Sequence, residues 1–360
     1  MNERRKWMKK ERTWSFCLVS LLFCIWSSAA FAADKITVRA LGSFTNQIQS
    51  TMIEVPFYKK LKAEAAAKNL DIQFRTMDEL GQKGYTALRQ LKEGTFDIIQ
   101  MQTGYISGDD PHWSELTLIG IKPDLDTCRE AANAYRPILD KGLAEKFNGR
   151  LLALWPYGAQ MFYFKGPIKS LADFKGKKIR ILTRPSADFV AYLGATGVTM
   201  PFPEVYTSLQ KGVIDGAISG ALAGNTASWW EASDYLYAMP LEFGMQAHAV
   251  NLNFWNKLNA DQREFLTQKF KEMDDEFWRV AKEVDEDGIN CNTGIGSCKY
   301  GKKGKMTLIR PTKADLDMMR KVGQEVILKN WVTECNKLDK NCSKSWNETV
   351  GKIVGMEIKY

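Results

Sequence analysis

The stretch RLLALWPYGAQMFYF, residues 150–164, decides how the chain is divided. It is mostly apolar, as a buried strand is, but Pro156 and Gly158 interrupt it near its middle. A strand that leaves one domain and enters the next has this composition. A second stretch, FGMQAHAVNLNFW at 243–255, predicts another crossing. Two lobes joined by more than one crossing strand predict a hinge with a cleft.

On both sides of residues 150–164 the sequence alternates between strand-like and helix-like segments. Apolar runs typical of strands occur at 35–41, 71–76, 96–102, 177–182 and 213–219. Helix-favouring segments separate them, at 57–69, 86–94, 186–195, 204–212 and 221–232. This order predicts α/β units, so the fold class we expect is α/β, with one set of units in each lobe.

The strongest helix signal covers residues 260–287. Its apolar residues recur at intervals of three and four, from Phe265 to Val284. This stripe predicts a helix that packs on the core and is long enough to lie against both lobes. A further helix is expected at about 312–330.

Residues 1–32 differ from the rest of the chain. Six basic residues precede an apolar run from about Phe16 to Trp26, and Ala30-Phe31-Ala32 follows it. This order is typical of a secretory signal peptide cleaved near Ala32. The alternative is a membrane anchor, but the run is too short to cross a bilayer comfortably. We therefore expect export to the periplasm, by the general or the twin-arginine route.

The charge balance is mild once residues 1–32 are removed. The loss of six basic and two acidic residues leaves 44 basic and 40 acidic ones. This is not the charge pattern of a nucleic-acid-binding protein, and the mixed signs are typical of a solvated surface. About 328 residues remain, enough for two domains. No later segment has 18 apolar residues in a row, so we expect a soluble protein, taken to be a monomer.

Five cysteines remain after export, and four form two pairs seven residues apart, Cys291 with Cys298 and Cys335 with Cys342. In an exported protein these pairs predict disulfides, and local pairing is the most economical of three connectivities. Zinc is the competing interpretation, disfavoured because no histidine lies near in the sequence and the spacing is not C-x-x-C. The bridges are expected to hold the C-terminal tail on the second lobe, with Cys128 free and buried.

Groups that could support catalysis are scarce. The only histidines are His112, in a turn-like stretch expected at the surface, and His248, in a crossing strand. No phosphate-binding glycine motif, no G-x-S-x-G and no metal-binding spacing occurs. No nucleophile, base and orienting group can be assembled from the sequence. These features argue against an enzyme and predict neither a cofactor nor a bound metal.

Three stretches of the second half follow in a recognisable order: SLADFKGKKIRI at 170–181, YLGATGVTMPFPEVYTSLQKGVIDGA at 192–217 and WWEASDYL at 229–236. The series resembles the solute-binding proteins of TRAP (tripartite ATP-independent periplasmic) transporters, and FPEVYTSLQKGVIDG is its most specific part. The resemblance implies a periplasmic-binding-protein-like clamshell of two α/β lobes, joined by crossing strands and a long helix. It also implies capture of a small organic anion and its delivery to cation-driven integral membrane subunits.

On this plan neither lobe is continuous in the sequence. Lobe I is expected to comprise residues 33–157 and 244–287. Lobe II is expected to comprise residues 158–243 and 288–360, including the cysteine-containing C-terminal extension.

In the family that this chain resembles, the arginine of K-[IL]-R binds the carboxylate of the ligand, and the matching residue is Arg180. A guanidinium offers two parallel N–H donors that match a carboxylate, which a lysine does not. A charge on an apolar strand is costly unless a partner meets it. The alternatives are that Arg180 pairs with a structural Asp or Glu, or lies at a sheet edge. The resemblance favours the ligand-binding role.

Other cleft positions depart from the family pattern. Gln160 stands where the family often has a second arginine, so the site loses a charge there but keeps a donor. Ser219 stands where an asparagine is usual, and Phe202 matches the aromatic residue that packs against the ligand. Because of the two departures, we assign neither a dicarboxylate nor a sialic acid. The sequence supports one carboxylate or sulfonate, with polar or aromatic contacts elsewhere.

Four weaker candidates complete the site. In α/β lobes ligands meet the loops at the C-terminal ends of strands, which suggests Gln102 and Thr103 in lobe I. Tyr157, at the interruption of residues 150–164, is a further candidate. Arg184, four residues beyond Arg180, either holds a second anionic group or is simply exposed.

Two other functions use the same cleft. A ligand-presenting sensor for a two-component kinase would have the same binding residues, and the neighbouring genes would distinguish it from a transport protein. An exported enzyme is the third hypothesis, which turnover of a bound ligand would favour.

Overall fold

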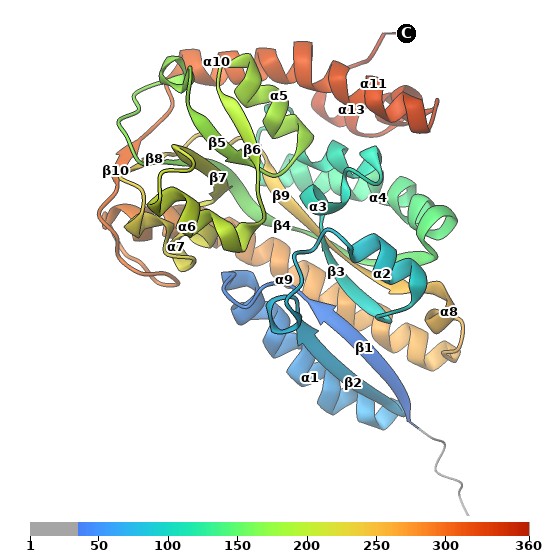
Figure 1. Ribbon diagram of the computed structural model, residues 1–360. Helices are drawn as coiled ribbons and strands as arrows, with labels where there is room; N and C mark the ends of the chain where they lie inside the picture. The colour runs from blue at the N-terminus through green and yellow to red at the C-terminus, as the bar shows by residue number, and fades with distance from the viewer. Residues whose placement is uncertain (1–34, 360) are drawn as a thin grey trace, which may run out of the picture. The chain divides into compact units, whose positions relative to one another are not determined.

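The computed structural model describes residues 35–359, which belong to one compact unit. The expected signal peptide, residues 1–32, lies outside the described residues. The strands follow the order β2-β1-β3-β9-β4-β7-β5-β6, with β8 paired to β4 and β10 to β8 (Figure 1). Their bounds are β1 (Ile36–Gly42), β2 (Leu70–Thr76), β3 (Ile98–Gln102), β4 (Gly149–Phe164), β5 (Lys178–Ile181), β6 (Thr196–Thr199), β7 (Gly216–Gly220), β8 (Tyr235–Tyr237), β9 (Phe243–Asn251) and β10 (Thr307–Ile309).

Strand β4 belongs to two sets of strands. Its first part pairs antiparallel with β9, and its last part, residues 160–164, pairs antiparallel with β7. The register shifts between Pro156 and Ala159, and Gly158 has φ of +119°, which L side chains rarely adopt. The proline lacks the N–H that a ladder needs, so the interruption lies where the strand changes partners. The structure confirms that residues 150–164 cross from one set of strands to the other.

Each set of strands is mostly parallel and covered by helices. Strands β1, β2 and β3 pair in parallel, and so do β5, β6 and β7. The helices that lie between consecutive strands of these sets supply the crossovers that parallel strands require: α1 (Val55–Ala65), α2 (Ala87–Glu93), α5 (Arg184–Tyr192) and α6 (Val205–Gln210). The other helices before α9 are α3 (Thr103–Ile106), α4 (Leu125–Phe147), α7 (Ala221–Thr226) and α8 (Leu252–Trp255).

The long helix α9 runs from Ala260 to Thr293, six residues beyond its predicted end. A capping box of Asn259 and Gln262 begins it, and Gly294 with φ of +74° ends it. The predicted stripe is buried apart from Phe265, which is half-buried. The helix packs against β4 and against α7, so it joins the two sets of strands as expected.

The C-terminal tail is helical. Helix α10 (Lys313–Val322) continues through a π-helical turn into α11 (Leu328–Leu338), which lengthens the helix predicted at 312–330. Two short helices follow, α12 (Cys342–Glu348) and α13 (Val350–Val354). Helix α11 packs on the 3₁₀ helix η4 (Pro111–Thr117), and α13 packs on α4 (Figure 1).

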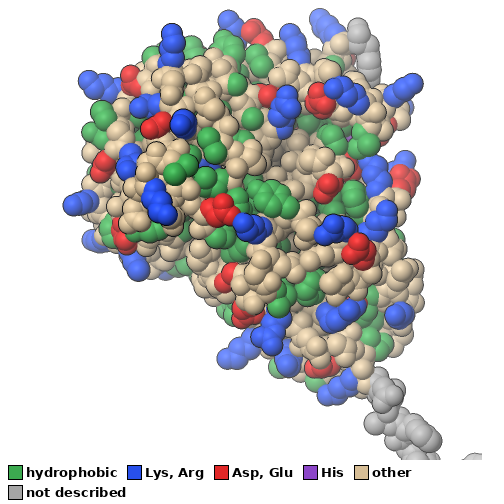
Figure 2. Space-filling view, viewed as in Figure 1, with side chains coloured by type: hydrophobic (Ala, Val, Ile, Leu, Met, Phe, Trp, Pro, Cys, Tyr) green, Lys and Arg blue, Asp and Glu red, His purple; other side chains and the backbone are tan. Residues whose placement is uncertain are grey.

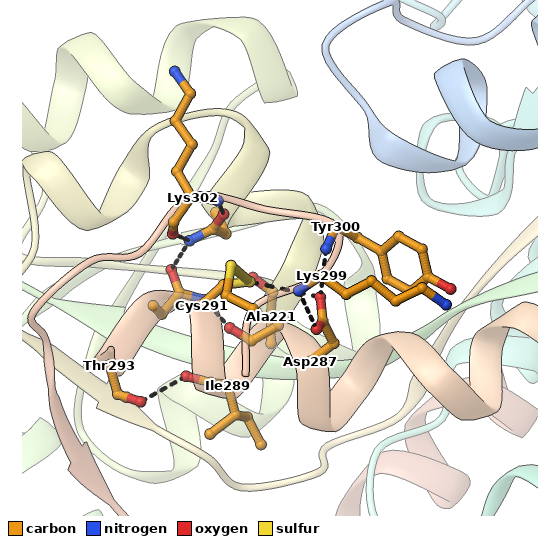
Figure 3. The surroundings of a disulfide bond; sticks show 12 residues. Ala221, Asp287, Ile289, Cys291, Thr293, Lys299, Tyr300 and Lys302 are labelled. Atoms are coloured by element: carbon orange, nitrogen blue, oxygen red, sulfur yellow. Dashed lines mark hydrogen bonds between the residues drawn. A yellow bond between two sulfur atoms is a disulfide. The ribbon is translucent and has the colours of Figure 1, made fainter. Parts of the chain in front are cut away.

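Both local disulfides are formed, Cys291–Cys298 and Cys335–Cys342, and Cys128 is free and buried, as the sequence predicted. The first bridge closes the loop after α9, where the Asp287 carboxylate also accepts hydrogen bonds from two backbone N–H groups of that loop (Figure 3). The second bridge is different from the expectation. It was expected to hold the tail on lobe II, but it lies beside η4, which belongs to the stretch assigned to lobe I, because α11 packs on η4.

The surface agrees with the charge balance of the sequence. On the face shown in Figure 2, Lys and Arg side chains are interspersed with Asp and Glu. Within residues 35–359, no helix has the length and apolar character needed to cross a membrane.

Candidate functional site

Arg180 is held in the middle of a buried strand. In β5, Lys178 is exposed, whereas Ile179, Arg180 and Ile181 are buried. The backbone of Arg180 pairs with Val198 of β6 on one side and with Ala217 of β7 on the other. Arg180 is therefore not at a sheet edge. Before it, Lys175 lies in a turn and Lys178 is the first residue of β5.

The guanidinium of Arg180 is only partly satisfied. Its Nε donates to the Met200 carbonyl at 3.0 Å, and its Nη1 donates to the Ile218 carbonyl at 2.8 Å. Nη2 is buried and has no hydrogen-bond partner among residues 35–359. Two carbonyls thus fix the plane of the guanidinium, and one pair of N–H donors stays available.

The charge of Arg180 has no protein counter-ion within the described residues. None of the ion pairs of residues 35–359 includes Arg180, which is 3% exposed. Burial lowers the pKa of Arg180 from its ordinary value, opposed by the neighbouring hydroxyls of Tyr105 and Tyr85. A buried cation that carbonyl and aromatic groups alone surround is costly. The structural alternative, a pairing with Asp or Glu, is not what the structure shows.

Aromatic side chains form the surroundings of this cation. The Trp229 ring centre lies 6.0 Å from the guanidinium carbon, within the range of a cation–π contact. Phe202 packs on Trp229 at 5.1 Å between ring centres. Tyr105 and Tyr85 meet edge to face at 4.7 Å. The predicted aromatic Phe202 therefore lies beside the arginine's own aromatic partner.

Contacts between the two expected lobes close over this region. The Phe202 N–H donates to the Tyr105 hydroxyl at 3.0 Å, and the Lys83 ammonium lies 2.6 Å from the Glu204 carboxylate. At Gly104, a Cβ atom would lie 2.6 Å from the Leu182 side chain, so a larger residue would hold the two sides apart. The structure thus shows the lobes in contact above Arg180.

The first lobe contributes uncharged hydrogen-bonding groups. The Oε1 atom of Gln47 accepts from the Ser43 hydroxyl at 2.5 Å, from the Tyr157 hydroxyl, and from Gln102 Nε2 at 3.4 Å. Gln49 Nε2 donates to the Tyr157 carbonyl at 2.9 Å. All five residues are buried. We call Ser43, Gln47, Gln49, Gln102 and Tyr157 the amide–hydroxyl network.

Two members of this network were predicted and three were missed. Tyr157 and Gln102 were candidates, whereas Ser43, Gln47 and Gln49 were not. All three missed residues follow the C-terminal end of β1, so the rule that suggested Gln102 could have found them. Thr103 is buried nearby in α3, but its hydroxyl donates to the Met245 carbonyl at 2.9 Å and holds β9.

Gln160 and Ser219 lie on neighbouring strands. Gln160 pairs with Gly220 across β4 and β7, and its side-chain Nε2 donates to the Gly158 carbonyl at 3.3 Å. A Cβ atom on Gly244 would lie 2.7 Å from that Nε2, so the amide sits tightly against β9. Ser219 is 5% exposed and follows Ile218, whose carbonyl binds Arg180. Ser219 therefore lies on the strand beside β5, and Gln160 lies one strand further away, on β4.

Arg184 lies elsewhere. Its side chain is 67% exposed, and Nε donates to the Asp188 carboxylate at 2.9 Å. It lines a cavity of about 230 Å³ together with residues of η4 and α11, such as Pro111 and Trp331. The exposure that the sequence left open as an alternative is what the structure shows, and the site proposed below does not include Arg184.

None of these site residues belongs to a metal-binding cluster. Within residues 35–359, the grouping of three metal-ligating side chains consists of His112, Cys335 and Cys342. His248 is fully buried, as expected of a packed residue, with Nε2 2.9 Å from the Glu54 carboxylate.

Comparisons with known proteins agree with this architecture. A protein of Salmonella typhimurium described as uncharacterized protein YiiZ is 29% identical over 215 residues, 58% of this chain and 64% of that protein. The sialic acid-binding periplasmic protein SiaP of Vibrio cholerae is 25% identical over 198 residues, 54% and 61% of the two chains. The chain thus spans less than two thirds of the length of these relatives.

A solved structure gives the same fold. The TRAP periplasmic solute binding protein of Desulfovibrio salexigens, solved with bound orotic acid, superposes with a TM-score of 0.77 at 18% identity. The match covers 89% of this chain and 100% of that one. It confirms the α/β fold of the TRAP solute-binding proteins, which are receptors and not enzymes.

The family described as bacterial extracellular solute-binding protein, family 7, matches residues 41–333, which is most of the chain. The match includes both crossing strands and every residue of the Arg180 region. This chain therefore belongs to family 7 of the bacterial extracellular solute-binding proteins, the family of the TRAP solute receptors, as its sequence motifs indicated.

Proposed function

We propose that this protein is the periplasmic solute-binding subunit of a TRAP transporter, exported by residues 1–32 and cleaved near Ala32. It captures a small organic anion through Arg180 and passes it to cation-driven membrane subunits. The observation that carries the proposal is the buried Nη2 of Arg180, which has no hydrogen-bond partner in the described part of the chain, whereas Nε and Nη1 do. An anionic oxygen is the partner that satisfies both the donor and the charge.

The surroundings support a ligand with one anionic group. Arg180 is buried and has no carboxylate partner within the described residues, and Arg184 is exposed and paired with Asp188. The amide–hydroxyl network adds donors and acceptors but no charge. We therefore propose a monocarboxylate or a sulfonate whose other end carries polar groups. The organic acids named for relatives, sialic acid and orotic acid, support a carboxylate.

Closure of the lobes supports reversible capture. Arg180 is 3% exposed beneath the Phe202–Tyr105 and Lys83–Glu204 contacts, so a ligand reaches it only when these contacts open. The kink of β4 at Gly158 and the start of β9 provide the positions where backbone rotation would open them.

A thermal-shift screen against organic acids tests the proposal. Monocarboxylates, sulfonates, dicarboxylates and matched neutral amides should be compared, and each hit measured by calorimetry. We expect one molecule of acid to bind per chain. Arg180→Ala should weaken binding at least about 1000-fold. The control Arg184→Ala should keep an affinity within about twofold of that of the natural protein. An acid bound equally well by Arg180→Ala would refute this site.

A further inference from the structure

His112 lies against the second disulfide. Its Nδ1 is 3.7 Å from the sulfur of Cys335, and its Nε2 is 3.8 Å from the sulfur of Cys342. His112 is 4% exposed and belongs to η4, so the prediction of a surface histidine is wrong. His112 therefore removes one of the two grounds for disfavouring zinc, the lack of a nearby histidine, while the spacing of the cysteines still differs from C-x-x-C.

A carboxylate and an orienting hydroxyl complete the cluster. Asp339 lies between the two cysteines in the sequence, and its Oδ2 is 3.5 Å from His112 Nε2. On the other edge of the ring, Nδ1 is 2.8 Å from the Tyr135 hydroxyl. When Nδ1–H donates to Tyr135, the lone pair of Nε2 faces Cys342 and Asp339. Metal-binding histidines are commonly oriented in this way.

We propose that His112, Cys335, Cys342 and Asp339 bind Zn²⁺ when the Cys335–Cys342 bridge is reduced. The histidine nitrogen and the two sulfurs all lie within 4.8 Å of one another. In tetrahedral zinc sites, Zn–S bonds of about 2.3 Å and Zn–N bonds of about 2.0 Å place neighbouring ligand atoms about 3.3 to 3.8 Å apart. Once the bridge opens, movements of the two sulfurs reach that geometry, and the Asp339 carboxylate, 3.5 Å from His112 but outside this grouping, moves in as fourth ligand.

Formation of the site is a reduction followed by metal binding. A dithiol reductant gives two electrons and two protons to the bridge, the S–S bond breaks, two thiols form, and the reductant becomes a disulfide. Zn²⁺ then replaces the two thiol protons, which pass to solvent. The disulfide and the metal are therefore alternative ways of joining α11 to α12.

The cluster is accessible to a metal ion. His112 and Asp339 line a surface cavity of about 460 Å³ between α4 and the tail helices. Lys146 also lines this cavity, but it is paired with Asp110 at 3.2 Å. A path from solvent is one of the features that a metal site requires.

The first disulfide provides a matched control in the same chain. Cys291 and Cys298 have the same sequence separation of seven residues. The neighbouring ligand type there is a carboxylate, since Cys291 Sγ lies 3.5 Å from Asp287 Oδ2. Within the described residues this pair is not part of a three-ligand cluster, so we assign zinc only to the second pair.

Two double variants separate the pairs. Cys291→Ser with Cys298→Ser keeps the proposed site, and Cys335→Ser with Cys342→Ser keeps the control pair. Both variants are reduced in the absence of oxygen, and the reductant is then removed. Zinc binding is measured by titration with Zn²⁺ in competition with a chromophoric chelator. A separate titration with Co²⁺ records the visible spectrum. We expect the first to bind one Zn²⁺ per chain and to give the visible bands of tetrahedral cobalt thiolate. The second should show neither.

Single changes in the first variant identify the other ligands. His112→Gln should weaken Zn²⁺ binding at least 100-fold, and Asp339→Asn about 10- to 100-fold. Equal zinc binding by the two double variants, or unchanged binding by His112→Gln, would overturn the proposal.

Alkylation of the reduced natural chain tests the proposal without any variant. Zn²⁺ should protect Cys335 and Cys342 but not Cys291 and Cys298, and equal labelling of both pairs would also overturn it.

Discussion

Arg180 in β5 is buried and Glu242, which precedes β9, is half-buried, and neither has an ion pair within the described residues, but only Glu242 can lose its charge. Among residues 35–359, the buried atoms Nη2 of Arg180 and Oε2 of Glu242 each have no hydrogen-bond partner. Burial raises the pKa of Glu242 to about 8, although the charge of Lys122 opposes the shift. Glu242 therefore takes up a proton near neutral pH, whereas an arginine stays charged.

Under the proposed function, this difference separates a ligand-binding residue from a structural one. A titratable group relieves its burial by changing protonation, so it needs no external partner. A permanent cation keeps its desolvation cost until an anion meets it. Of the two unpaired groups, Arg180 is therefore the one that calls for a ligand.

The largest expected effect comes from neutralising each charge in turn. Arg180→Gln should weaken binding of a monocarboxylate by about 1000-fold, or about 4 kcal/mol, because the charge-assisted contact is lost. Glu242→Gln should change that affinity less than twofold. Calorimetric titration of both variants with the same acid checks this. A large loss in both would show that Glu242 also acts on the site.

The second effect is that of Glu242→Gln on the pH dependence of the unfolding free energy. Because the pKa of folded Glu242 is about 8 and its ordinary value is 4.5, the folded protein holds the extra proton between these pH values. Its contribution to stability is full below about pH 4.5 and is lost as pH rises through 8. Glu242→Gln should therefore stabilise the protein by about 1 to 3 kcal/mol near pH 8.5 and little near pH 5. Urea unfolding at both pH values measures it, with Glu204→Gln as the control.

Groups that already have partners should matter less than either charge. Tyr157→Phe removes the hydroxyl that binds Gln47 and Ser43, but Gln47 keeps the bonds from Ser43 and Gln102. We expect a loss of about 1 kcal/mol in unfolding free energy and less than about tenfold in ligand affinity. Urea denaturation and calorimetry measure the two quantities. A loss as large as that of Arg180→Gln would place the hydroxyl in direct contact with the ligand.

The smallest effect is expected at the rim of the cleft. Lys83 and Glu204 are ion-paired at 2.6 Å, but their side chains are 63% and 46% exposed. Lys83→Ala should weaken ligand binding less than about fivefold, and the effect should fade in high salt. Affinity measured at two salt concentrations tests this. An effect that salt does not change would point to a contact other than the ion pair.

The sequence predicted the parts of this protein that local pattern determines. The apolar run of residues 150–164 and its interruption predicted the crossing strand, and the apolar stripe of residues 260–287 predicted α9. The two disulfides followed from spacing of seven residues. Arg180 could be chosen as the candidate ligand-binding residue because its motif is local to one strand and the turn before it.

What the sequence did not predict depends on long-range packing. His112 meets Cys335 across 223 residues of chain, and no local pattern links them. The packing of α11 on η4 could not be predicted for the same reason. This packing places the second disulfide beside η4 and not on lobe II, where it was expected. Gln47 was missed because the sequence does not distinguish it from the other polar residues after β1, and only the folded chain places Tyr157 beside it.

The shared strand β4 ties the folding of the two lobes together. Without β4, one sheet would end at an open β9, and in the other β7 would be separated from β8. An open strand edge invites pairing with other chains. Each lobe therefore relies on a strand that it shares with the other, so an exchange of one lobe for that of another protein would have to include part of β4.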